Sequence, residues 1–454
     1  MQSVRRESGN DRPDPLRACV HPGSIRAMLN TCLRCLLVGL AVVMASGCTF
    51  TYPVKQEVLP QPATVAMIQP WPLRVGLYIP PAVRSRVLAQ QAWRVPAGEA
   101  VASNFQWALE QMFARVGVLD APPAGQALPD GLNGAVELSD IAYDDAVPGS
   151  LRYELGLYSA KGERVDGWPI TTPLPVWDIE ASGLSSLMMN RGTELAYAMR
   201  DVSAQFMVHF ADRPAVQAWL AGEGVAAAAV RPAFSGSGVV PPAAPKILLV
   251  PNLGTWLYTD AARSMDCVGN RLAQASPPFE VIAADQVRLA FFPWLEPSTA
   301  PKSLADLQRW AAEPAIRNKM RAIGARYLLE FHGGTKTEIP GGGILCGAGF
   351  GGGGCFGFAW GSRESAFSAT LLDMWENGTP LDASATQHSG VYVPAFGLPI
   401  PLMAATETAA CEDLARRIHD LLMQQGPRYR GRLPGRNRGL GSSRFPSGLS
   451  GFEA

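Results

Sequence analysis

Several features that particular protein classes need are scarce or missing in this 454-residue sequence. Basic and acidic residues balance, with 39 of each, so the whole chain has no electrostatic basis for binding nucleic acid. After Cys48 there is no run of about 18 apolar residues, so no membrane-spanning helix is expected there. Hydrolase and nucleotide signatures are missing too: G-x-S-x-G, H-E-x-x-H and the P-loop do not occur. These absences argue against an enzyme and predict a protein that works by binding, without a cofactor.

Histidine is also scarce, with five in the chain. Those beyond Cys48 are scattered over predicted strands and helices: His209, His332, His388 and His419. His332 and His388 are predicted on neighbouring strands, where both could contact one metal ion, but no third ligand is evident. The acidic residues Asp140, Asp144 and Asp145 lack the regular spacing of a calcium loop. No metal site is therefore predicted.

A short apolar run near the start of the chain ends in a cysteine. Arg34 precedes the run "LLVGLAVVMA" (36–45), and Ser46-Gly47 leads into Cys48. This order of charge, apolar core and small residues is that of a secretory signal peptide. We therefore expect residues 1–47 to be a leader that is removed. Because the residues before Met28 are polar and unlike a signal, translation is predicted to begin at Met28.

A cysteine directly after such a site resembles the lipobox of bacterial lipoproteins. In that family the thiol receives a diacylglycerol, the signal is cut before the cysteine, and the new amine is acylated. The resemblance implies that Cys48 is lipidated and that several acyl chains anchor the mature protein stably. Ala45 stands where leucine is commonest in the family. Thr49 is not the aspartate that retains such proteins in the inner membrane of enteric bacteria, so the resemblance implies the outer membrane, facing the periplasm.

The cysteines beyond Cys48 are even in number. Of the eight in the chain, Cys19, Cys32 and Cys35 lie in the predicted leader. The remaining ones predict two disulfides in an oxidising compartment, with three possible pairings: Cys267, Cys346, Cys355 and Cys411. A Cys346–Cys355 bridge would close a glycine-rich loop, and a Cys267–Cys411 bridge would join the start of a domain to its end. Buried free thiols are the alternative.

Periodicity divides the chain into two α/β (α+β) domains of similar plan, each with a strand, a helix, a meander and a closing helix. The domains are predicted at 71–221 and 246–425. Residues 48–70 have no period and several prolines, which predicts a tether from lipid to domain. Residues 222–245 are rich in alanine, glycine, serine and proline, which predicts a flexible linker. Residues 426–454 hold six arginines against one acid and are predicted to be a disordered basic tail.

The order of elements in the second domain resembles the small α/β domain of periplasmic assembly lipoproteins. The matching stretches are "KILLVPN" (246–252), the helix after it, "FEVIAADQV" (279–287) and "MRAIGARYLLEFHGGT" (320–335). The families in question are the TolB amino-terminal domain, the penicillin-binding-protein activator LpoB and the curli secretion lipoprotein CsgG. None of them lends a catalytic residue to this chain.

A glycine-rich insertion, "GGGILCGAGFGGGGCFGFAWG" (341–361), separates two predicted strands. Gly347, Gly349 and Gly352 fit G-x-G-x-x-G, but no helix start follows, so a nucleotide site is not expected. We expect a flexible hairpin pinned by Cys346 and Cys355. The alternative, which the CsgG resemblance suggests, is an interaction or membrane-touching hairpin. A membrane-crossing strand needs about 9 to 11 residues, and each side of this insertion is shorter.

These observations predict a lipid-anchored, non-catalytic periplasmic protein with a binding or accessory role in cell-envelope assembly or transport. The expected partners are the membrane, through the lipid, and an unidentified envelope protein, with no nucleic acid and no small-molecule cofactor. An oligomeric export or pore component that uses the 341–361 hairpin is the alternative. An envelope hydrolase is the least expected function.

Overall fold

The computed structural model describes residues 50–424 with several gaps: 62–63, 91–92, 145–148, 175–190, 227–229, 235–245, 252–259, 350–351, 376–379 and 397–404. In three stretches of strand it describes the backbone alone: 335–349, 352–363 and 388–396. The predicted leader, the lipidation site Cys48 and the basic tail lie outside the described residues.

The first domain is built on a five-stranded sheet with the order β5-β2-β6-β7-β8. β2 pairs in parallel with β5 and β6, and β6, β7 and β8 form an antiparallel meander. Its main elements in chain order are β2 (Trp71–Tyr78), α3 (Gly98–Met112), β5 (Phe113–Val118), β6 (Gly134–Asp144), β7 (Ser150–Ser159), β8 (Arg164–Pro173), α6 (Arg191–His209) and α7 (Pro214–Gly222). A small sheet of β1 (Phe50–Thr51), β4 (Trp93–Pro96) and β3 (Val87–Gln90) and the short helix α2 (Pro81–Arg84) complete it.

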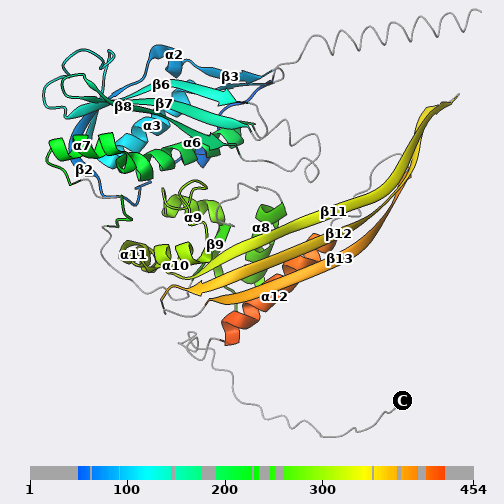
Figure 1. Ribbon diagram of the computed structural model, residues 1–454. Coiled ribbons are helices and arrows are strands. Elements are labelled where there is room, and N and C mark those ends of the chain that lie inside the picture. Colours follow the sequence, from blue (N-terminus) through cyan, green and yellow to red (C-terminus); the bar gives the residue numbers. More distant parts are fainter. Residues whose placement is uncertain are drawn as a thin grey trace, which may run out of the picture.

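The second domain has the same topology, with the order β10-β9-β11-β12-β13. Its elements are β9 (Lys246–Pro251), α8 (Asp260–Gln274), β10 (Glu280–Ile282), β11 (Ala325–Gly349), β12 (Gly352–Asp373), β13 (Leu381–Phe396) and α12 (Ala405–Gln424). Three helices are inserted before β11: α9 (Ala284–Ala290), α10 (Leu304–Ala312) and α11 (Pro314–Ala322). Figure 1 shows α8 and α12 on one side of this sheet. The α/β (α+β) class and the two domains of similar plan are thus confirmed.

The hydrophobic periods in the sequence account for the elements of both domains. In α3, Phe105, Leu109 and Met112 recur at helical spacing and are fully buried. In β7, Tyr153 and Leu155 alternate with more exposed neighbours and face the core. α10 starts where Ser303 Oγ accepts a hydrogen bond from the Asp306 amide at 3.2 Å, which satisfies a free N–H of the first turn.

A disulfide joins the two helices that cover the second sheet. Cys267 of α8 is bonded to Cys411 of α12, at a sequence separation of 144 and with their Cα atoms 6.3 Å apart. Cys411 is fully buried in the cluster that both helices form with the sheet. This is one of the pairings that the sequence left open. Cys346 and Cys355 occupy directly opposite positions of β11 and β12, where only the backbone is described.

The described part of the predicted tether, residues 50–61 and 64–70, is not free, contrary to the prediction. Leu59 and Met67 are 3% and 2% exposed, and β1 pairs with β4. The Met67 amide donates to Phe292 O at 2.8 Å, and Met67 O accepts from Trp294 Nε1 at 2.8 Å. This segment therefore lies in the seam between the domains. We call this segment (50–61 and 64–70) the strap. Its apolar residues follow no period because most of it crosses the seam in irregular backbone.

The predicted linker is also partly ordered. Ala233 donates its amide hydrogen to Met67 O at 3.0 Å, and Pro232 forms a bridge with Ile68. Phe234 packs against the large core cluster, and Lys319 lies over its ring. The prediction of a flexible linker is therefore wrong for residues 230–234, which bind the strap instead.

Polar contacts across the seam come from one face of α6. Arg200 Nε lies 2.8 Å from Glu296 Oε1, and these side chains are 1% and 0% exposed. Asp201 Oδ1 accepts hydrogen bonds from the amide and hydroxyl of Ser298 at 2.9 and 2.6 Å. The Tyr197 hydroxyl donates to Asp285 at 2.8 Å. Because the domains share buried charges as well as a continuous apolar cluster, they are docked rather than independent.

Candidate functional site

The main candidate site is a three-stranded ribbon that β11, β12 and β13 form beyond the body of the second domain. These strands are 25, 22 and 16 residues long. β9 pairs with β11 only up to Phe331, so the ribbon continues without a fourth described strand. Figure 1 shows it projecting well past α8 and α12. The predicted insertion 341–361 is therefore not a loop between two strands but the outer part of the strands themselves.

Gly333 marks the root of the ribbon. Its φ is +121°, a left-handed conformation that side chains with a Cβ rarely adopt. A Cβ at this position would also clash with the backbone oxygen of Ala366 on β12. The register at this point pairs Gly333 with Phe367, the last large apolar residue of the core on β12. Only glycine satisfies both constraints where the strand leaves the core.

A band of charged and polar residues crosses all three strands at one level. The strand register aligns Lys336 with Glu364 and His388, Thr337 with Arg363 and Ser389, and Glu338 with Ser362. No single strand shows this band, because the residues paired across neighbouring strands are 24 or more positions apart in the sequence. The antiparallel pairing alone brings them side by side.

Past this band the described strands carry no charged residue. The uncharged stretches are 339–349 of β11, 352–361 of β12 and 391–396 of β13. The register pairs Trp360 with Gly341 and Tyr392, and Phe356 with Leu345 and Phe396. The first two stretches reach the length of about 9 to 11 residues that a membrane-crossing strand needs. The expectation that each side is too short is thus wrong, because the strands begin before residue 341.

His332 and His388 do not lie on neighbouring strands. His332 is opposite Ser368 and His388 is opposite Glu364, with β12 between them. His332 Nε2 instead lies 3.3 Å from Glu330 Oε1 of the same strand. Within the described part of the chain, no group of three or more His, Cys, Asp or Glu residues is arranged to hold a metal ion.

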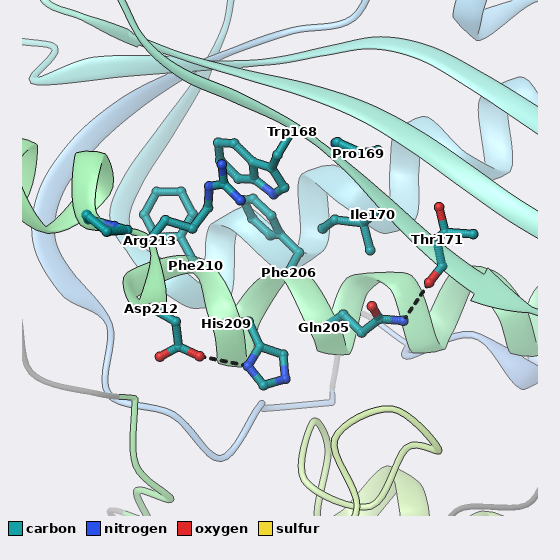
Figure 2. Close-up of a pocket in the computed structure, with 11 residues that line it drawn as sticks. Trp168, Pro169, Ile170, Thr171, Gln205, Phe206, His209, Phe210, Asp212 and Arg213 are labelled. Carbon is teal, nitrogen blue, oxygen red and sulfur yellow. Dashed lines mark hydrogen bonds and ion pairs between the residues drawn. The ribbon is translucent and has the colours of Figure 1, made fainter.

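A second candidate is a cleft of about 440 Å³ in the first domain, between β8 and the end of α6 (Figure 2). Its wall contains Trp168, Phe206 and Phe210, and its mouth contains His209 and Asp212. The aromatic rings are at most 8% exposed, so little of their surface is open to a ligand.

The polar groups of this cleft already have partners within the protein. His209 Nδ1 lies 2.8 Å from Asp212 Oδ2, and Gln205 Nε2 donates to Asp201 Oδ2 at 3.0 Å. Arg213 donates two hydrogen bonds to Asp166, at 2.6 and 3.1 Å, and covers the Trp168 ring. These hydrogen bonds hold the pKa of Asp166 below its usual value. The cleft therefore has the character of a satisfied surface network and not of a binding site.

The buried charges of the seam were not found by sequence reasoning, because Arg200, Asp201 and Glu296 lie in segments with no chemical motif. Burial raises the pKa of Glu296, and the positive charges of Arg200 and Arg288 oppose this effect. Arg200 Nη1 also donates to Val58 O of the strap at 3.0 Å. This cluster connects α6, the strap and the second domain, which is a structural role.

Among the described residues, no helix is long and apolar enough to cross a membrane.

No family model and no curated protein matches the chain. Similar solved structures include a PelC dodecamer from Paraburkholderia phytofirmans, 15% identical, which covers 41% of this chain and 94% of that chain with a TM-score of 0.20. A protein from Xanthomonas campestris assigned to DUF330 is 13% identical, covers 39% and 97%, and has a TM-score of 0.21. A hypothetical protein from Chlamydia trachomatis is 11% identical, covers 39% and 96%, and has a TM-score of 0.19. These scores are too low to support an argument about function.

Proposed function

We propose that this chain is a lipid-anchored, non-catalytic protein of the bacterial cell envelope, held at the periplasmic face of the outer membrane. Its role is that of an accessory protein in envelope assembly or transport, and it acts by binding through the ribbon. The lipid anchor is proposed from the leader and Cys48 in the sequence. The non-catalytic role is proposed because the sequence lacks hydrolase and nucleotide motifs.

The observation that carries the binding role is the uncharged end of the ribbon. Figure 1 shows this end projecting past α8 and α12, and its residues are mostly glycine, aromatic and aliphatic. Because a ribbon that no other element covers is only marginally stable in water, an external surface is expected to cover it. The strap and the buried seam charges support this role, because they keep the ribbon at one orientation to the anchored domain.

Intact mass, measured without reductant on protein extracted from bacterial membranes, tests the anchor. We expect the mass of residues 48–454 plus the lipid groups, reduced by two hydrogens for the Cys267–Cys411 bond. A second pair of missing hydrogens would indicate a Cys346–Cys355 bond. Cys48→Ser is the control and is expected to remain without lipid. An unprocessed wild-type chain would contradict the anchor and the compartment.

The second candidate function is an oligomeric export or pore component whose ribbon enters the bilayer. Two observations favour it: the uncharged stretches have the length of membrane-crossing strands, and a level polar band borders them. Figure 1 also shows β3 and the outer end of the ribbon pointing to the same side of the view. β3 belongs to the same small sheet as β1, which begins two residues after Cys48 in the sequence.

Liposome flotation of the full chain with Cys48→Ser separates the two candidates, because binding then cannot come from the anchor. If the ribbon enters lipid, this protein floats, and aspartates at the paired positions Ala359 and Val393 abolish flotation. The matched control places aspartates at Ser368 and Ser384, which are paired in the same strands inside the body. Flotation that survives Ala359→Asp/Val393→Asp, or is absent in the parent, would exclude bilayer entry and leave the accessory role.

A further inference from the structure

The outer edge of β5 is an unprotected sheet edge. β5 is the last strand of the first sheet, and among the described strands it pairs only with β2. Its sequence is "FARVGV" (113–118). Ala114 and Arg115 are exposed, and Val118 is 53% exposed, which is high for a large apolar side chain. A row of backbone N–H and C=O groups on such an edge is a template for another strand.

Two other edge strands of the sheet bodies, β8 and β10, carry protective features that β5 lacks. β8 carries Pro169 and Pro173, which cannot donate backbone hydrogen bonds, and Gln205 Nε2 donates to Thr171 O between them. β10 has three residues and lies beside the Lys246–Glu280 ion pair. β5 has no proline and no acid, and Arg115 is its single charge. Natural edge strands that lack such protection are usually covered by something.

The sequence of β5 complements itself in an antiparallel pair. With Val116 at the two-fold axis, Ala114 of one copy lies opposite Val118 of the other, so exposed apolar residues meet. Arg115 then lies opposite Gly117 rather than opposite its own copy, which avoids a like-charge pair. A Cβ at Gly117 would meet nothing within 4 Å, so the space above this residue is open to the long Arg115 side chain.

We infer that a second copy of this chain pairs with β5 around a two-fold axis at Val116. The two five-stranded sheets then continue into one another through an isologous interface. A pair of six-residue strands is a small interface, so the dimer is weak in dilute solution. Attachment of both copies to one surface would raise their effective concentration. The inference itself does not depend on the proposed function.

Cysteine crosslinking tests this register. Two full-length proteins are prepared in the Cys48→Ser background, one with Ala114→Cys and one with Val118→Cys, and are oxidised separately and as a mixture. We expect a disulfide-linked dimer in the mixture at a yield at least tenfold above either protein alone, because residues 114 and 118 oppose each other only between copies. Val65→Cys, at a 72% exposed position outside β5, is the control and is expected to give no such dimer with either.

Sedimentation equilibrium provides a second readout that does not need a cysteine. Ala114→Lys/Val118→Lys brings a lysine opposite a lysine in each copy, and we expect at least a tenfold weaker self-association. Val65→Lys is the matched control and is expected to match the parent. A parent that stays monomeric at all concentrations, or a mixture that crosslinks no better than its components, would overturn the inference and leave the ribbon and anchor experiments unaffected.

Discussion

The two domains share one strand order, yet their meanders differ in length by about a factor of two. β6, β7 and β8 have 11, 10 and 10 residues, whereas β11, β12 and β13 have 25, 22 and 16. In the first domain the strands end where the core ends. In the second domain they continue past the core into a polar band and then an uncharged end. The difference teaches that the fold needs only the short meander, and the proposed binding role rests on the extra length.

The domains also differ in what holds them. The first has no described disulfide and relies on a large aromatic cluster, in which Phe206 packs against Phe105 and Phe210 with ring centroids 4.9 and 5.3 Å apart. The second domain has a smaller hydrophobic cluster under α8 and α12, and the Cys267–Cys411 disulfide joins these two helices. The seam then joins the two, through the strap and the pair Arg200–Glu296. Each of these devices predicts a different response to substitution.

Substitutions in the seam between the domains are expected to cause the largest loss of stability. Glu296→Ala leaves the Arg200 guanidinium buried without its carboxylate, which costs about 3–5 kcal/mol of unfolding free energy. Arg200→Met/Glu296→Leu removes both charges and is expected to recover most of that loss, since neither charge then needs compensation. Urea unfolding measures both. Glu57→Ala breaks an exposed pair with Lys55 and is the control, expected to change stability by less than about 1 kcal/mol. A double variant no better than the single one would contradict this account.

Removing the Cys267–Cys411 disulfide is expected to cause a somewhat smaller loss of stability, confined to the second domain. Cys267→Ser/Cys411→Ser is expected to cost about 2–5 kcal/mol, because the bond closes a long loop and limits the unfolded chain. Urea unfolding with and without reductant measures it, and reductant should change the parent but not the variant. Cys346→Ser/Cys355→Ser, in the ribbon's end, is the matched control and is expected to leave the body's stability unchanged. Equal losses of unfolding free energy in the two double variants would show that the end of the ribbon belongs to the core.

A pH effect is expected in the first domain, where Arg213 holds the pKa of Asp166 low. A lowered carboxyl pKa contributes stability above its unfolded value of about 3.9, and this contribution is lost as pH falls through the folded pKa. Arg213→Ala is expected to raise the pKa of Asp166 toward its usual value and to weaken this acid dependence. NMR titration of the Asp166 carboxyl measures the shift. Arg164→Ala removes only a weaker charge interaction and should raise the pKa less.

Shortening the ribbon is expected to have the smallest effect on stability. Replacing residues 339–361 by an Asn-Gly turn joins Glu338 to Ser362, which are already paired, and leaves the core residues of β11 and β12 in place. We expect the urea midpoint to stay within experimental error while ribbon-dependent binding is lost. A loss of more than about 1 kcal/mol would mean that the end stabilises the body, contrary to the comparison of the two domains.

Much of the fold was predictable because its signals are local. Helical stripes such as that of Phe105, Leu109 and Met112, and alternation such as that of Tyr153 and Leu155, follow from neighbours in the chain. The strap was missed because Met67 meets Trp294 across 227 residues, and no periodicity records such a contact. The length of the ribbon was underestimated from the sequence. Its polar band joins residues of three strands, and these residues come together only when the strands pair. The lipidation predicted at Cys48 is the opposite case, because its signal is in the sequence and Cys48 lies outside the described structure.

By itself the sequence determined the class of the fold, the repeated plan of the two domains and the cysteines available for bonding, since hydrophobic period and residue identity are properties of the chain alone. The tertiary structure decided that Cys267 pairs with Cys411, that the domains are docked through buried charges, and that the glycine-rich segment is the end of a long ribbon. The physical reason is the distance along the chain over which each effect acts. Local backbone preference acts over a few residues, whereas pairing, burial and charge compensation depend on which distant residues the fold brings together.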